Sequence, residues 1–159
     1  MRSIQSKIVT EEVMVRERAR VQAAGQTLVF TNGCFDILHP GHVVYLSKAK
    51  KLGDILVVGL NSDASVRKIK GRGRPINNEK ARGVVLSALS CVDYISIFSE
   101  NTPECLIGKL KPDILVKGGD WKGKQIAGSC IVRAQGGRVV TVPFVKGFST
   151  TSLIKKMAG

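Results

Sequence analysis

Long apolar runs are missing from this chain of 159 residues. The most apolar stretch, residues 55–60, is far shorter than the roughly 20 residues that a membrane-spanning helix needs. Residues 1–24 alternate charged and single apolar side chains, which is not the pattern of a signal peptide. We therefore expect a soluble, cytoplasmic protein with no membrane partner.

Cysteine is sparse and scattered. The four cysteines form no C-x-x-C pair, which argues against a zinc site or a disulfide framework and favours free thiols in a reducing compartment. Cys34 lies in the segment that holds both histidines, and a small residue at a strand end is a commoner role for cysteine than a nucleophile. The two histidines have no third or fourth ligand at suitable spacing, so we expect no protein-bound metal ion.

Acidic and aromatic residues are also few. Twelve acidic against 25 basic residues leave a formal net charge of +13, and aromatic residues make up only 5% of the chain. No aromatic side chain is interleaved with the densest basic cluster, so a platform for stacked bases is not evident. We expect a small phosphorylated substrate and no nucleic acid, with a basic nucleic-acid-binding domain as the alternative from another class. The basic cluster consists of Arg67, Lys68, Lys70, Arg72 and Arg74.

What the sequence does contain is an alternation of short apolar runs and amphipathic stretches. Strands that are apolar on both faces and alternate with helices predict an α/β fold, a single Rossmann-like domain. Its central parallel sheet, of about five strands, is expected to have helices on both faces. We expect the main domain at residues 27–159, after an N-terminal helical segment at 1–26. Strands are expected at 27–31, 55–60, 94–98, 114–116 and 138–142, and helices at 10–24, 41–52, 63–69, 78–89, 103–110, 129–135 and 151–157.

The only two histidines of the chain flank one glycine at the predicted start of a helix. His39 and His42 lie three residues apart on a helical turn, so they project from nearly the same face. Backbone N–H groups and the positive end of a helix bind phosphate at such a place, and two imidazoles can stabilise charge on a phosphorus centre under attack. An ionised nucleophile needs no further base, so the protein would act through positioning and electrostatics.

Polar residues also follow other predicted strands. The carboxyl ends of parallel strands share one edge of the sheet, where segments that are distant in the sequence can line one crevice. Asn61 and Asp63 follow the second strand, residues 117–121 follow the fourth, and residues 149–151 precede the last helix. The sequence therefore predicts one site at this edge, centred on the two histidines.

Two motifs carry a family resemblance. Residues 33–42, GCFDILHPGH, resemble the G-x-F-D-x-x-H-x-G-H signature of the cytidylyltransferase-like nucleotidyltransferases. Residues 147–151, GFSTT, resemble the late G-x-S-T-T element of the same superfamily, which lies at a helix N-terminus. Within that superfamily the chain looks most like the adenylyltransferases that act on D-glycero-β-D-manno-heptose 1-phosphate. The segments that carry this closer likeness are 61–66, 70–71, 74–76, 117–121 and 143–151.

The resemblance implies a reaction and a role for each matching residue. AMP would pass from ATP, which brings Mg²⁺ with it, to the sugar 1-phosphate, giving ADP-heptose and pyrophosphate for the lipopolysaccharide inner core. The implied catalytic residues are His39, His42, Lys70 and Arg82. The implied nucleotide-binding residues are Thr31, Gly33, Cys34, Phe35, Asp36, His39, Gly41, His42, Lys117, Gly118, Asp120, Ser149, Thr150 and Thr151. The implied sugar-phosphate-binding residues are Asn61, Asp63, Lys70, Arg74, Arg82 and Trp121.

Simpler roles compete for several of these residues. Residues 149–151 could simply cap the last helix without binding a ligand. Asp63 could be an N-cap, and Arg82 could be a solvated helical arginine. Lys117 and Asp120 could belong to an ordinary turn at a strand end. Trp121 and the residues after it look closer to glycerol 3-phosphate cytidylyltransferase, so a CTP-dependent enzyme is the alternative within the same class. The family habit of dimerising implies a homodimer.

Overall fold

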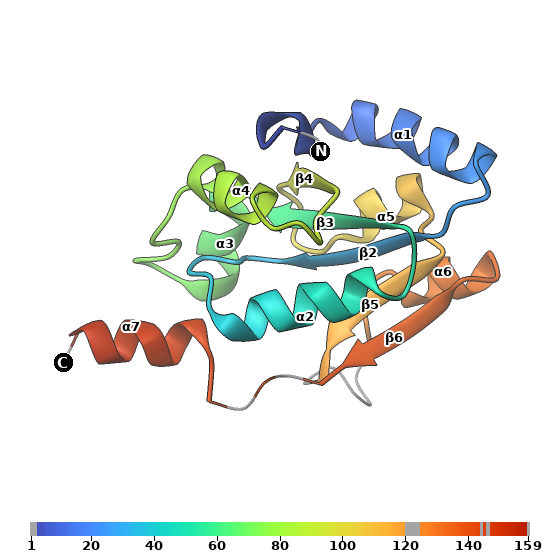
Figure 1. Cartoon of the computed structure of the whole chain (residues 1–159). Helices are drawn as coiled ribbons and strands as arrows, with labels where there is room; N and C mark the ends of the chain where they lie inside the picture. The colour runs from blue at the N-terminus through green and yellow to red at the C-terminus, as the bar shows by residue number, and fades with distance from the viewer. Residues whose placement is uncertain (1–2, 120–124, 144, 146, 159) are drawn as a thin grey trace.

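Six parallel strands form one sheet within the described part of the chain (Figure 1). The structure is a computed structural model that describes residues 3–119, 125–143, 145 and 147–158. The strands are β1 (Ile8–Val9), β2 (Leu28–Gly33), β3 (Ile55–Asn61), β4 (Tyr94–Phe98), β5 (Ile114–Gly118) and β6 (Arg138–Val142). The helices are the short 3₁₀ turn Gln5–Lys7, α1 (Glu11–Ala23), α2 (Pro40–Lys50), α3 (Asp63–Lys70), α4 (Glu79–Ser87), α5 (Glu104–Leu110), α6 (Ser129–Ala134) and α7 (Thr150–Ala158).

The predicted α/β fold is confirmed, with one strand more than expected. The additional strand, β1, has two residues and pairs with β4 at the edge of the sheet. Two residues are too short to show the alternation by which a strand is recognised in a sequence. The ends of β2 and β5 also lie two residues beyond the predicted ends, at Gly33 and Gly118.

The strand order places a switch point next to β2. The order is β1-β4-β3-β2-β5-β6, so the chain runs from β2 outward to β3 and then returns to β5 on the other side of β2. In open parallel sheets the connections that follow two such strands leave in opposite directions, and ligands bind in the crevice between them. The fold therefore positions a site at the carboxyl ends of β2 and β5.

Apolar side chains on both faces of the sheet build two cores. Leu56 and Val58 of β3 point to the face that α2 and α4 cover, with Leu46 and Leu86 packed there. Val57, between them in sequence, points to the opposite face, under α1, α5 and α6. All five of these side chains have no solvent exposure, so the sheet is buried on both sides. None of the described helices is long and apolar enough to span a bilayer.

A buried methionine and an ion pair attach helix α1 to the rest of the domain, near the amino ends of the strands. Thr10 caps the helix as predicted, because its hydroxyl accepts a hydrogen bond from the Val13 N–H at 3.4 Å. Met14 of α1 lies in the core with no exposure. Arg18 donates to both carboxylate oxygens of Asp113, at 3.0 and 2.9 Å, and to the Leu110 carbonyl at 3.1 Å.

We predict that Arg18→Gln lowers the free energy of unfolding by about 1–2 kcal/mol, because the bidentate pair with Asp113 is only partly exposed. Arg16→Gln is the matched control, since Arg16 is exposed on the same helix, and its effect should stay within about 0.5 kcal/mol. Urea unfolding of the three proteins measures both values. Equal stability of the two variants would contradict the role given to Arg18.

Candidate active site

A cavity of about 480 Å³ lies at the carboxyl ends of β2, β3 and β5, beside the start of α7. This is the edge of the sheet that the sequence predicted. The predicted residues that line it are Gly33, Cys34, Phe35, Asp36, His39, Gly41, His42, Asn61, Lys70, Arg74, Lys117, Gly118, Ser149, Thr150 and Thr151. The lining residues that sequence reasoning did not assign are Asn32, Tyr45, Ile69, Val145 and Phe148.

Some of these missed residues had a signal in the sequence. Tyr45 follows His42 by three residues on α2, the same spacing that led to the histidine pair. Its hydroxyl is hydrogen-bonded to the Thr31 hydroxyl at 2.7 Å and donates to the Val116 carbonyl at 3.2 Å. Thr31 is therefore a fully buried support of the cavity and not part of its lining. Phe148 lies inside the GFSTT element, next to Ser149.

The two imidazoles stack on each other at the start of α2. Their ring centroids are 3.8 Å apart and the ring planes differ by 19°. His39 is the N-cap residue, in an extended conformation, and Pro40 follows it in the first helical position. The expected common face for His39 and His42 is thus present.

Gly41 is required by the close packing around this pair. A Cβ atom at Gly41 would lie 3.0 Å from His39 Nδ1 and 3.3 Å from Phe148 Cβ. The Phe148 ring in turn lies 6.2 Å from the His39 ring, nearly parallel to it. Glycine at this position therefore lets the two sequence motifs approach each other.

Burial favours the neutral form of both imidazoles. Desolvation lowers the pKa of His39, and desolvation together with the neighbouring His39 lowers the pKa of His42 to about 4. The Nδ1 atoms of both rings are buried and have no hydrogen-bond partner among the described residues. Nε2, the other ring nitrogen of each histidine, is not among the buried atoms without a partner, and both residues line the cavity.

Phe35 fixes the loop that leads to the histidines. Its backbone has φ of +44°, in the left-handed region that side chains other than glycine rarely adopt. The ring is buried, lies edge-on to His42 with centroids 5.1 Å apart, and covers Gly33. A Cβ at Gly33 would lie 2.9 Å from this ring, which explains the glycine two residues before the phenylalanine.

The N-terminus of α7 forms the opposite wall of the cavity. Ser149 caps the helix, since its Oγ accepts a hydrogen bond from the Ser152 N–H at 3.0 Å. The Thr150 hydroxyl donates to the Ile37 carbonyl, in the loop before His39, at 3.4 Å. Ser149 therefore caps the helix and also lines the cavity. The backbone N–H groups at a helix N-terminus are suited to phosphate.

Cationic side chains from two elements complete the lining. Lys70, the last residue of α3, and Arg74, in the loop after it, both face the cavity. Lys117 of β5 faces it too and donates a hydrogen bond to Asn32. The rest of the predicted basic cluster, Arg67, Lys68 and Arg72, is exposed and outside the cavity. Burial raises the pKa of the Cys34 thiol despite the nearby cations, which does not favour a nucleophile.

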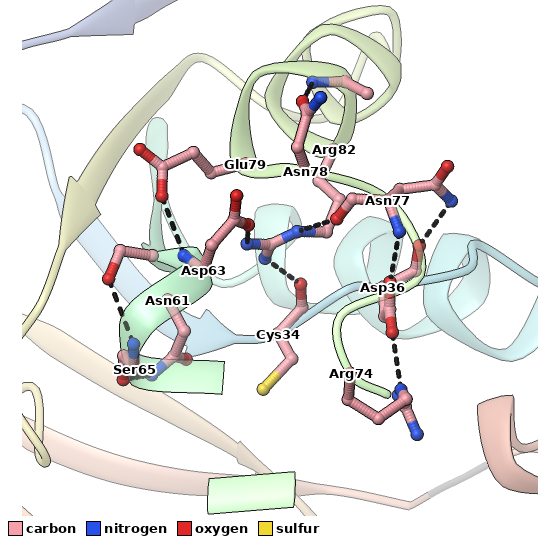
Figure 2. Close-up of polar contacts among 12 residues, drawn as sticks. Cys34, Asp36, Asn61, Asp63, Ser65, Arg74, Asn77, Asn78, Glu79 and Arg82 are labelled. Carbon is pink, nitrogen blue, oxygen red and sulfur yellow. Dashed lines mark hydrogen bonds and ion pairs between the residues drawn. The ribbon is translucent and has the colours of Figure 1, made fainter. Parts of the chain in front are cut away.

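Arg82 does not reach the cavity, where a catalytic residue was expected. It is 2% exposed, and its guanidinium donates to the Cys34 carbonyl at 2.5 Å, the Asn77 carbonyl at 2.9 Å and Asp63 at 2.9 Å (Figure 2). Neither the solvated arginine nor the substrate contact considered from the sequence matches this position. The residue instead joins the end of β2, the loop before α4 and the start of α3.

Asp63 is likewise a structural partner and not a cap. The N-cap of α3 is Ser62, whose hydroxyl accepts from the Ser65 N–H at 3.2 Å, and Asp63 is the first helical residue. Asp63 does not line the cavity, whereas Asn61 does and donates to the Ser65 hydroxyl at 2.9 Å. Two further predicted site residues, Asp120 and Trp121, lie outside the described residues.

Comparison with known proteins finds relatives that align with most of the chain. The bifunctional protein HldE of Trichlorobacter lovleyi is 52% identical over 98% of this chain, and that of Campylobacter concisus is 57% identical over 86%. The chain spans about a third of the length of these curated relatives, 32% and 28%.

Two solved structures resemble this chain. A lipopolysaccharide core biosynthesis protein from Thermoplasma volcanium is 34% identical, with a TM-score of 0.64 over 78% of this chain and 100% of that one. Pantothenate synthetase from Thermus thermophilus shares the fold alone, at 14% identity and a TM-score of 0.62 over 94% of this chain and 70% of that one. The family model described as cytidylyltransferase-like matches residues 30–155. The chain therefore belongs to the cytidylyltransferase-like family.

Proposed function

We propose that this chain is a nucleotidyltransferase that transfers AMP from ATP to D-glycero-β-D-manno-heptose 1-phosphate. A phosphate oxygen of the sugar 1-phosphate attacks the α-phosphorus of ATP, and the bond from that phosphorus to the oxygen bridging the β-phosphate breaks. ADP-heptose and pyrophosphate are the products. The phosphate of the sugar 1-phosphate is already ionised when it binds, so no proton has to be removed from the nucleophile.

The observation that carries the proposal is the junction of His39 and His42 with the start of α7 in one cavity. A triphosphate chain between them would receive hydrogen bonds from the imidazoles on one side and from the hydroxyl and backbone N–H groups of Thr150 and Thr151 on the other. The name of one relative, a lipopolysaccharide core biosynthesis protein, supports an acceptor that belongs to the synthesis of the lipopolysaccharide core.

The two histidines act as neutral hydrogen-bond donors in this proposal. A donor aimed at the phosphorus centre stabilises the charge that builds up there, and it does so more strongly where water is excluded. Two protonated imidazoles at 3.8 Å would repel each other, which agrees with the lowered pKa of His42. Lys70, Arg74 and Lys117 then carry the positive charge that draws in the two phosphorylated substrates.

The remaining features of the proposal concern the setting of the enzyme. Mg²⁺ enters as part of the ATP substrate and lies on the triphosphate oxygens. The four cysteines are free, which suits the cytoplasm, where ATP is available. A homodimer, with neither nucleic acid nor a membrane as partner, is also part of the proposal.

The substrate test compares nucleotides and acceptors in all combinations. Pyrophosphate release is measured with ATP or CTP against heptose 1-phosphate or glycerol 3-phosphate. We expect turnover with ATP and heptose 1-phosphate at least 100-fold faster than with any other pair. Turnover confined to CTP and glycerol 3-phosphate would replace the proposed substrates, and no release with any pair, together with salt-dependent binding to duplex DNA, would favour the nucleic-acid-binding alternative.

We predict that the pKa values of both imidazoles of the ligand-free protein lie below the ordinary histidine value of 6.5, with that of His42 at about 4. NMR of protein labelled in histidine has only two imidazole rings to follow, because the chain has two histidines. The unfolded chain binds more protons than the folded one between these pKa values, so unfolding should become easier as the pH falls from about 6.5 to about 4. Two histidines that titrate at or above 6.5 would contradict neutral donors.

A further inference from the structure

Asp36 is a buried carboxylate whose acceptor positions are all occupied by one loop. Its side chain has no solvent exposure. One oxygen accepts from the backbone N–H groups of Ile76 at 2.8 Å and Asn77 at 3.0 Å, and the other accepts from the Arg74 Nε at 2.6 Å and again from Ile76 at 2.9 Å (Figure 2). A carboxylate bound in this way has no oxygen left for a nucleotide or a metal ion.

The ionised state of Asp36 is secured by the same contacts. Burial alone would raise its pKa, but the hydrogen bonds from Asn77, Ile76 and Arg74 outweigh burial and hold the pKa below its usual value. The backbone of Asp36 takes part as well, because its carbonyl accepts from the Asn77 side chain at 2.9 Å. Asp36 thus fixes residues 74–77 against the start of the histidine loop.

Arg74 is the part of this loop that faces the cavity. Its side chain is 16% exposed and lines the cavity, and only its Nε is bonded to Asp36. Both Nη groups are without a partner among the described residues, and Figure 2 shows the end of the guanidinium turned away from the carboxylate. Two free donors in one plane match two oxygens of a phosphate group.

Arg74 and Lys70 enter the cavity from elements other than those that carry the expected triphosphate contacts. Arg74 and Lys70 come from α3 and the loop after it, whereas the histidines and the Ser-Thr-Thr element come from α2 and α7. Lys70 and Arg74 are four residues apart in the sequence, and both line the cavity together with Cys34. Two phosphates that react must approach closely, and cations on the acceptor side offset their repulsion.

We propose that Asp36 positions Arg74 so that its two free Nη groups, with Lys70, bind the phosphate monoester of the acceptor. Asp36 is then a positioning residue and not a nucleotide contact. The subsite takes a phosphate dianion of any small acceptor, and the heptose in it rests on the proposed function.

The test is a titration with heptose 1-phosphate and, separately, with inorganic phosphate. The protein is first saturated with the α,β-methylene analogue of ATP, which fills the triphosphate subsite and cannot react. We expect Arg74→Gln and Asp36→Asn to weaken the binding of both phosphates by about 10–100-fold, with the affinity for the ATP analogue changed less than about threefold. Arg72→Gln, an exposed residue two positions away, is the matched control and should leave all three affinities unchanged.

The combined variant tells positioning from a general structural role. If Asp36 acts through Arg74, Asp36→Asn should weaken phosphate binding no further in a protein that already carries Arg74→Gln. An equal loss in both backgrounds, binding of both phosphates as in the unaltered protein, or an unaltered protein that binds neither phosphate would overturn the proposal. Weakened binding of inorganic phosphate without turnover of heptose 1-phosphate would instead keep the subsite and reject the proposed acceptor.

Discussion

The contact between His39, Gly41 and Phe148 is where the two distant motifs of the chain meet. The imidazole and the phenylalanine ring approach because position 41 has no side chain, and the Thr150 hydroxyl adds a hydrogen bond to the Ile37 carbonyl nearby. Without this junction the histidines would face open solvent, and the start of α7 would be an ordinary capped helix end. Packing at one glycine therefore decides whether the chain has one phosphate site or two unrelated surface features.

Around that junction the site is built in two layers of polar contacts. Apart from the paired Asp36, the inner layer that lines the cavity is cationic or neutral, with Lys70, Arg74 and Lys117 beside the two imidazoles. The outer layer holds the ion pairs, in which Asp36 meets Arg74 and Asp63 meets Arg82. The carboxylates of Asp36 and Asp63 thus hold loops in place through their ion pairs. Lys70 and Lys117 and the Nη groups of Arg74 face the cavity, where anionic ligands can bind.

Much of the fold and of the cavity could be predicted from the sequence, because both follow from strong local patterns. Apolar runs located the five longer strands, and the GCFDILHPGH and GFSTT segments located both walls of the site. The two-residue strand β1 carries no such pattern, since only its pairing with β4 defines it. Arg82 could not be placed either, because a helical arginine reads the same in a sequence whether it is solvated or bound to two carbonyls and a carboxylate. Ser62 and Asp63 are both good caps, and only the backbone at the start of α3 distinguishes them.

The central claim is that the histidine loop and the start of α7 bind one polyphosphate chain. Its most direct test is a titration with inorganic triphosphate, which has no base or ribose, followed on the ¹⁵N signals of the two imidazole rings. The account predicts that the signals of both rings shift together and that Thr151→Val, which removes one hydroxyl with little change of shape, weakens the binding by about 3–10-fold. Signals that do not respond to triphosphate, or a Thr151→Val protein that binds it as tightly as before, would contradict the account.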